Sequence, residues 1–325
     1  MTTNGHGVNP IAPTLAEVRA AACLLAPYAI RTPLLRLNVP AVRGEIYLKL
    51  ENLQPIGAYK VRSMGNVMLN QDAAALRDGV YTASSGNAGL ALAWMAQRLG
   101  ITARVYAATG SPAGKLDAIR HFGAEVRLLS HAEWWRIIEN RGHPAERGQY
   151  ADAVRDNLAL AGNATIGLEI VEQLPQVDTI IVPFGGGGVA CGIAAAVRAL
   201  KAGTRIIVAE SEAAAPATAA FQAGQPVTVA MQPSFISGAG APSVLQEMWP
   251  LIQALIDDTR VVPVSGVASA IRLLAQHNHV VAEGAGAIPV AAALAERDSI
   301  GKTVCVVTGG NIDLEVLARI LLQQL

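Results

Sequence analysis

Short apolar runs alternate with helical patterns along most of this chain, and no other feature constrains its fold as strongly. The runs that suit strands are four to six residues long. They are residues 45–50, 79–83, 103–107, 125–129, 179–182, 205–209 and 303–307. Helical patterns separate most of them, and this order predicts an α/β architecture with mostly parallel sheets flanked by helices.

The helical patterns begin at Thr14 and Glu17, whose spacing is that of a capping box that opens a helix to about Ile30. A second helix begins near Lys60. The other helical patterns cover residues 87–99, 115–122, 163–174, 189–199, 213–223, 268–276, 285–295 and 312–322. Residues 132–150 are polar and mark the return from a small domain to a larger one. Residues 224–243, rich in Gly, Pro and Ser, are expected at the surface or at the mouth of a cleft.

The charge balance and the cysteines limit the partners and the compartment. The 325 residues hold 25 Lys and Arg against 25 Asp and Glu, so no basic surplus exists to neutralise a nucleic acid or an anionic membrane. Cys23, Cys191 and Cys305 lack metal-ligand spacing and are expected to be buried thiols in a reducing compartment. Because residues 1–13 do not resemble a signal peptide, a cytoplasmic location is expected.

One uncharged run, residues 179–197, is long enough to cross a membrane, but Pro183 and four successive glycines interrupt it. A buried strand, a loop and a helix are expected there instead. A side chain in such a loop would block a phosphate from the backbone N–H groups and from the helix N-terminus. A tight turn needs only one or two glycines. The spacing is not that of a nucleoside-triphosphate loop, so a single phosphate is expected at Gly185, Gly186, Gly187 and Gly188.

Lys60 is the candidate nucleophile. It lies where the strand at residues 45–50 passes through a polar loop into a helix, a place from which an amine can reach a cofactor. The amine attacks a carbonyl only when it is deprotonated, which requires burial or another cation nearby. The alternative is a solvated loop lysine without a chemical role.

Two further loops follow predicted strands. Residues 84–89 offer N–H groups and hydroxyls that can hold an anion, or they form an ordinary N-cap cluster. Thr308 follows the strand at residues 303–307 and either contacts a cofactor or caps the last helix.

Taken in order, four motifs resemble the threonine/serine dehydratase family, which includes serine racemase. They are residues 51–55 with 57–60, residues 84–87, residues 185–188 and residues 308–311, and the resemblance extends over roughly residues 14–323. It implies an enzyme of fold-type II that depends on pyridoxal 5′-phosphate (PLP). In that fold two open, twisted sheets face each other across the cofactor. The small domain would be residues 73–151, inserted in a large domain of residues 1–72 and 152–325.

The resemblance also implies the roles of individual residues. The catalytic residues would be Lys60, which carries PLP as a Schiff base and then removes the Cα proton, and Ser85, the opposite-face acid/base in serine racemase. PLP would be bound by Tyr59, Lys60, Asn87, Gly185, Gly186, Gly187, Gly188, Glu283 and Thr308. The substrate would be bound by Ser84, Ser85, Gly86, Asn87 and Ala88. A hydroxyl from Thr308 at the pyridine nitrogen favours elimination over transamination.

Departures from the family pattern bear on the substrate. Ala88 stands where many members have His, and Tyr59 and Ala58 stand where Phe and Ser are usual. Ser237 occupies a position at which Asp is common. These changes remove polar bulk, so a roomier apolar pocket would accept an amino acid such as 3-phenylserine, unless other side chains refill the space.

No metal site is predicted. By resemblance, a cation site would be built from Glu210, the carbonyl of residue 214 and a carboxylate at position 216, but that position is Pro216. The six histidines show no metal-ligand spacing.

The expected activity is elimination of water from an L-3-hydroxy amino acid to give a 2-oxo acid and ammonia. Two alternatives stay open, a serine-type racemase that uses the same groups and a non-catalytic protein that binds PLP or an amino acid. The expected partner is the small amino-acid substrate, with no nucleic acid and no membrane, and a homodimer is left open.

Overall fold

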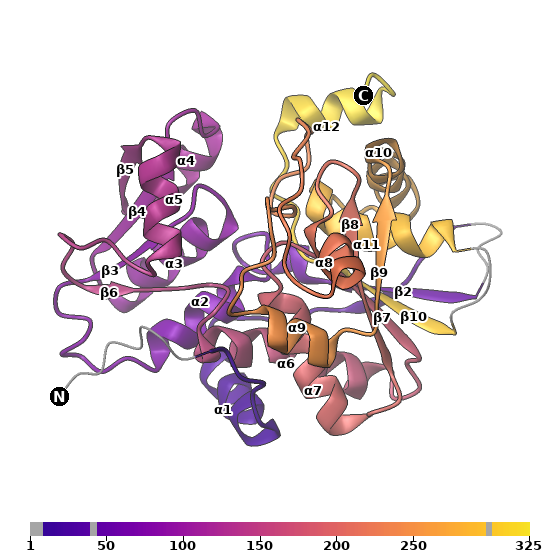
Figure 1. Cartoon of the computed structure of the whole chain (residues 1–325), viewed down its shortest axis with the longest axis horizontal. Coiled ribbons are helices and arrows are strands. Elements are labelled where there is room, and N and C mark those ends of the chain that lie inside the picture. The colour runs from indigo at the N-terminus through magenta and orange to yellow at the C-terminus, as the bar shows by residue number, and fades with distance from the viewer. Residues whose placement is uncertain (1–8, 40–43, 297–300) are drawn as a thin grey trace.

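A computed structural model describes residues 9–39, 44–296 and 301–325, and within them the strands form two sheets (Figure 1). The six-stranded sheet has the order β1-β2-β10-β7-β8-β9, and the four-stranded sheet has the order β5-β4-β3-β6. Across the described chain, neighbouring strands pair in parallel except β1 and β2, which are antiparallel. The predicted α/β class with two mostly parallel sheets is confirmed.

The strands are short, as the sequence pattern indicates. Those of the large sheet are β1 (Leu34–Arg36), β2 (Glu45–Leu50), β7 (Thr179–Pro183), β8 (Arg205–Ser211), β9 (Asp258–Val262) and β10 (Lys302–Val307). Those of the small sheet are β3 (Val80–Ala83), β4 (Ala103–Ala108), β5 (Glu125–Leu129) and β6 (Gln149–Tyr150). The small sheet lies within the predicted small domain, whose boundaries stay a prediction.

Helices cover both sheets. The helices near the small sheet are α3 (Asn87–Leu99), α4 (Ala113–His121) and α5 (His131–Glu139). The others are α1 (Leu15–Leu25), α2 (Lys60–Leu69), α6 (Asn157–Gln173), α7 (Gly188–Leu200), α8 (Pro216–Ala223), α9 (Trp249–Leu255), α10 (Val264–Leu273), α11 (Gly284–Ala295) and α12 (Leu314–Leu321). Short helical turns lie at Glu51–Leu53 and, as a π-helix, at Leu274–Asn278.

The large sheet is buried on both faces. One core joins strand residues such as Ile180 and Val182 to α6, α7 and α9, and a second joins Ile181 and Ile207 to α10 and α11. Figure 1 shows these two groups of helices on opposite sides of the sheet. Because every residue of β7 is buried, that strand reads as a continuous apolar run, as central parallel strands do.

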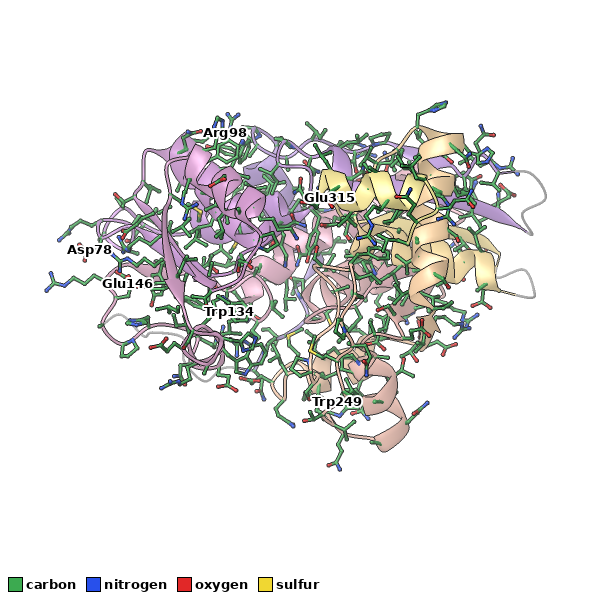
Figure 2. All side chains as sticks on the ribbon, turned by 90° about the horizontal axis from the view of Figure 1, so that it is seen from above. Asp78, Arg98, Trp134, Glu146, Trp249 and Glu315 are labelled. Atoms are coloured by element: carbon green, nitrogen blue, oxygen red, sulfur yellow. The ribbon has the colours of Figure 1, made fainter. Side chains whose placement is uncertain are left out.

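The small sheet has its own core, which α2 shares with α3. The two parts of the molecule lie side by side, and α2 lies between them (Figure 1). Seen from above in Figure 2, the labelled side chains of the smaller part are Asp78, Arg98, Trp134 and Glu146. Those of the larger part are Trp249 and Glu315.

Several predicted elements match the structure, including the strands at residues 45–50 and 125–129 and the helix at residues 87–99. The uncharged run at residues 179–197 is a strand, a loop and a helix, as expected. Within the described ranges, no helix is both long and apolar enough to cross a membrane.

Three sequence predictions need correction. The capping box of Thr14 and Glu17 is present, but α1 ends at Leu25 rather than near Ile30, since Pro27 cannot continue the helix. The sequence reading named no helix or strand in the polar stretch at residues 132–150, which contains most of α5 and all of β6. Cys191 and Cys305 are buried as expected, whereas Cys23 is exposed.

Candidate active site

Lys60 is the first residue of α2, and a tight turn precedes it. Gly57 in that turn has a φ of 72°, and a Cβ there would come within 2.6 Å of Asn311 Oδ1. Only glycine therefore fits the turn without strain. The amine of Lys60 lies 3.4 Å from the carbonyl oxygen of Ala153 and 4.7 Å from the centre of the Tyr59 ring. The amine thus faces the segment that returns from the small sheet to α6.

A buried cluster of charged side chains fixes the start of α2. Two residues after Lys60, Arg62 donates from Nε to Glu51 Oε2 at 2.8 Å and from Nη2 to Glu51 Oε1 at 2.9 Å. Arg62 Nη1 donates to Glu169 Oε1 at 2.7 Å, and Lys49 Nζ donates to Glu169 Oε2 at 2.5 Å. Two cations and two carboxylates meet here largely away from water, so their formal charges cancel.

Burial and pairing act in opposite directions on this cluster. Burial by itself would raise the pKa of Glu51, but the charge and hydrogen bonds of Arg62 outweigh it and hold that pKa below its ordinary value. Burial lowers the pKa of Lys49 despite the neighbouring Glu169. The sequence did not predict a role for the residues of this cluster. Its pairing depends on the packing of α6 against α2, which no local pattern indicates.

The four glycines form the turn from β7 into α7, as the sequence predicts. Gly187 is the N-cap with a φ of 87°, and no described side chain caps the helix. A Cβ at Gly186 would lie 2.7 Å from Val154 Cγ1, and one at Gly188 would lie 2.8 Å from the Val154 carbonyl oxygen. The glycines let this backbone pack against Val154, the neighbour of Ala153. The uncapped N–H groups of the α7 N-terminus suit a phosphate.

The Ser84 loop connects β3 to α3. Gly86 is the N-cap of α3, and no side chain in the described part of the chain caps this helix. Ser84 Oγ accepts a hydrogen bond from Gly86 N at 3.2 Å. Ser85 lies in the same loop and Ala88 in the first turn of α3, and both are partly exposed. Backbone N–H groups at an uncapped helix start suit an anion, and the role of this loop as a carboxylate site stays a prediction.

Glu283 joins the two parts of the molecule at the site. It directly precedes α11, is 3% exposed, and accepts a hydrogen bond from Asn87 Nδ2 at 2.7 Å. Burial raises the pKa of Glu283 to about 7, although the Asn87 hydrogen bond and the charge of Lys115 oppose the rise. Asn311 Nδ2 donates to Asn87 Oδ1 at 2.8 Å. Two predicted cofactor residues, Asn87 and Glu283, are thus in direct contact.

Thr308 lies at the carboxyl end of β10 and is 3% exposed. Its carbonyl oxygen accepts a hydrogen bond from Tyr59 N at 3.0 Å. The next residue, Gly309, has no room for a side chain, because a Cβ there would overlap Glu283 Oε1. The backbone at Thr308 therefore links Lys60, through its neighbour Tyr59, to the surroundings of Glu283.

Glu210 has a structural role in this chain. Its carboxylate accepts hydrogen bonds from Ala217 N, Thr218 N and Thr218 Oγ1 at 2.7 to 2.8 Å, and so it caps the start of α8, which begins with Pro216. Burial raises the pKa of Glu210. Among the described residues no group of three or more His, Cys, Asp or Glu side chains is placed to hold a metal ion.

Sequence reasoning missed one residue at the site, Lys115, whose partner is Ser237, the residue found at a position where Asp is common. Lys115 Nζ donates to Ser237 Oγ at 2.8 Å, and this bond joins α4 to the segment after α8. Lys115 follows β4, which pairs in parallel with β3. The loops after two adjacent parallel strands open at the same edge of a sheet, so the position of Lys115 near the Ser84 loop could have been predicted.

The fold and the site define an α/β enzyme in which contacts link the lysine at the start of α2 to two uncapped helix N-termini. Residues 25–309 match the family described as "Pyridoxal-phosphate dependent enzyme". An L-threonine ammonia-lyase of Geobacter sulfurreducens is 38% identical over 295 residues, which cover 87% of this chain and 70% of that protein. A serine racemase of Oryza sativa subsp. indica is 32% identical over 318 residues, covering 93% of this chain and 91% of that protein.

Solved structures give the same result. The structure of maize serine racemase superposes with a TM-score of 0.85 at 28% identity, and the match covers 97% of this chain and 98% of that one. The chain therefore belongs to the family of pyridoxal-phosphate-dependent enzymes, and its fold is that of fold-type II.

The residues present fit PLP. The glycine turn packs against Val154, where side chains at Gly186 and Gly188 would collide, and no described side chain caps α7, so the N–H groups at its start suit a phosphate. Lys60 supplies an amine on the other side of Ala153 and Val154. Asn87 and Glu283 add polar groups beside the same space.

Proposed function

We propose that this enzyme removes water from an L-3-hydroxy amino acid of the threonine or serine type, releasing a 2-oxo acid and ammonia. One observation carries the proposal, the set of contacts that links the start of α2 to two uncapped helix N-termini, those of α3 and α7. Through Ala153 and Val154, Lys60 adjoins the glycine turn. On the other side, Asn311 Nδ2 donates to the Ile56 carbonyl at 2.9 Å and to Asn87 Oδ1 at 2.8 Å, which ties the turn before α2 to the start of α3.

Each group then has a task in the reaction. Bound PLP supplies the electron sink for the charge that develops at Cα. Gly185–Gly188 would hold the cofactor phosphate at the start of α7, and the Ser84 loop would hold the substrate carboxylate. The amine of Lys60 would hold the cofactor and would accept the Cα proton at Nζ. Tyr59 lines the position of that amine, since its ring centre lies 4.7 Å from Nζ.

Asn87, Glu283 and Thr308 set the state of the cofactor ring. Asn87 would donate to its phenolic oxygen, and Glu283 holds the Asn87 amide in place through the 2.7 Å hydrogen bond. The Thr308 hydroxyl would face the pyridine nitrogen. A hydroxyl does not force that nitrogen to take a proton, so the charge at Cα is short-lived and loss of the 3-hydroxyl is favoured over transamination.

The test is release of 2-oxo acid by the purified holoenzyme from L-serine, L-threonine and L-threo-3-phenylserine, measured side by side. We expect at least one of the three to be converted with PLP bound. Preference for phenylserine would support the part of the proposal that rests on the small side chains of Ala88 and Ser237. Preference for threonine would mean that other side chains refill that space. A holoenzyme that converts none of them would contradict the dehydratase proposal.

A serine-type racemase is the second candidate. Relatives named serine racemase and the presence of Ser85 in the Ser84 loop favour it. Formation of D-serine from L-serine in the same assays, at a rate above that of pyruvate release, would establish racemisation as the main reaction.

We also propose a cytoplasmic location, which the three free cysteines support, because exposed thiols such as Cys23 persist in reducing compartments. A homodimer remains part of the proposal and is tested by measuring the mass of the protein in solution.

A further inference from the structure

Lys115 makes a hydrogen bond across the mouth of the site. It lies in the first turn of α4, beside the small sheet, and its Nζ donates to Ser237 Oγ at 2.8 Å. Ser237 belongs to the segment between α8 and α9 on the larger part of the molecule. Two hydrogen bonds thus join the two parts of the molecule at the site, this one and the one from Asn87 to Glu283.

The residue after Ser237, Gly238, lies close to two predicted cofactor residues, Glu283 and Gly185. Gly238 has a φ of 83°, and a Cβ at Gly238 would lie 3.8 Å from Glu283 Oε1. On the other side, the Gly238 carbonyl oxygen lies 3.2 Å from the position of a Cβ at Gly185, the first glycine of the phosphate turn. The Lys115–Ser237 bond therefore holds the residue next to the backbone that lies close to both Gly185 and Glu283.

The partner of Lys115 is neutral. Within the described chain, no carboxylate lies within ion-pair distance of Nζ, although the charge of Lys115 reaches Glu283 and lowers its pKa. A hydrogen bond from an ammonium group is stronger than one between neutral groups, and it depends on the partly desolvated setting at Ser237. One such bond can thus bias the position of α4 and of the adjoining Ser84 loop, because α3 and α4 pack together.

We propose that Lys115 is a substrate-positioning residue that acts through Ser237. Its bond to Ser237 holds the small sheet, and with it the Ser84 loop, against the larger part so that the loop meets the substrate carboxylate. This inference rests on the proposed function for the identity of the ligand, an L-amino acid. It does not depend on which reaction follows binding.

The test is a double-mutant cycle on the holoenzyme with Lys115→Met, Ser237→Ala and both changes together. Affinity for L-serine and L-threonine is read from the change in cofactor absorbance on titration, and kcat and KM are measured in parallel. We expect each single change to weaken amino-acid binding about tenfold to a hundredfold, the effect of losing one charged hydrogen bond. The double change should weaken it no more than either single change. Cofactor absorbance without amino acid and the unfolding temperature should not move.

Arg120→Met is the matched control on the same helix, because Arg120 pairs only with Asp117 at the surface among the described residues and lies away from Ser237. It should leave the affinity unchanged. If the effects of Lys115→Met and Ser237→Ala multiply in the double variant, Lys115 acts on the ligand directly and the inference is wrong. Unchanged affinity in both single variants would also overturn it. Because affinity is read from the cofactor absorbance and not from product release, failure of the dehydratase assay would leave this result interpretable.

Discussion

Glu283 shows how a single buried carboxyl can be adapted to a cofactor site. Its side chain is 3% exposed, and an amide from Asn87, rather than a cation, lies within hydrogen-bonding distance. An amide compensates burial only in part, so the pKa stays raised, at about 7. At neutral pH the group can therefore hold or release a proton beside the expected phenolic oxygen of PLP.

The raised pKa of Glu283 predicts a pH-dependent loss of stability. The folded state binds the Glu283 proton more tightly than the unfolded state, so its stabilising effect is complete below pH 4.5 and is lost as the pH rises toward 7. The loss in the free energy of unfolding is about 3 kcal/mol. We expect Glu283→Gln to remove this loss, so that the variant gains stability relative to the wild type between pH 5 and pH 8. Urea unfolding of the PLP-free wild type and the PLP-free variant at pH 5 and pH 8 gives their free energies of unfolding. If the difference between the two proteins is the same at both pH values, the assignment is contradicted.

At the scale of the elements, the start of α2 is the best-supported part of the site. The cluster of Lys49, Glu51, Arg62 and Glu169 ties α2 to β2 and α6 at once. Its formal charges cancel, so it fixes the start of α2 without adding net charge near Lys60. A buried group of this kind does little for stability as a whole, but removing one member leaves an unpaired charge.

We therefore expect Glu51→Gln to destabilise the protein by about 3 to 5 kcal/mol. The matched control is Glu125→Gln, since Glu125 pairs with Arg127 at the surface and should contribute less than about 1 kcal/mol. Chemical denaturation of both variants gives the two values. Similar losses for the two changes would show that the buried cluster does not hold α2.

The local patterns of the sequence determine much of this organisation. The strand at residues 45–50 and the helix at residues 87–99 follow from apolar periodicity and from flanking turn residues. The same signals did not predict β9, because Asp258 and Arg260 are charged residues typical of loops. In the structure β9 is an edge strand, and these two side chains form an ion pair at 2.7 Å. They also placed the start of α6 at residue 163, whereas Asp156 caps the helix and it begins at Asn157.

Site contacts between distant segments could not be predicted in this way. Glu283 and Asn87 are 196 positions apart, and Lys115 and Ser237 are 122 apart, so only the packing of the two parts brings them together. The motif residues Lys60, Gly185–Gly188 and Thr308 were predicted because each follows a strand. In a parallel sheet the loops at the carboxyl ends of the strands form the site.

At the scale of the whole molecule, the site belongs to neither sheet alone. The loops after β3 and β4 come from the small sheet, and those after β2, β7 and β10 come from the large one. The hydrogen bonds from Asn87 to Glu283 and from Lys115 to Ser237 cross between them. Movement of one part against the other would open or close the space in which cofactor and amino acid meet.

The central claim is that Lys60 carries the cofactor, and one measurement tests it most directly. The holoenzyme is reduced with borohydride and digested, and the residue bearing the pyridoxyl group is located by mass spectrometry. We expect the pyridoxyl label on Lys60 in the wild-type protein. The Lys60→Ala variant should lack the label, the cofactor absorbance and the release of 2-oxo acid. Lys201→Ala, at the distant end of α7, should keep all three. A label on another lysine, or turnover retained by Lys60→Ala, would contradict the account.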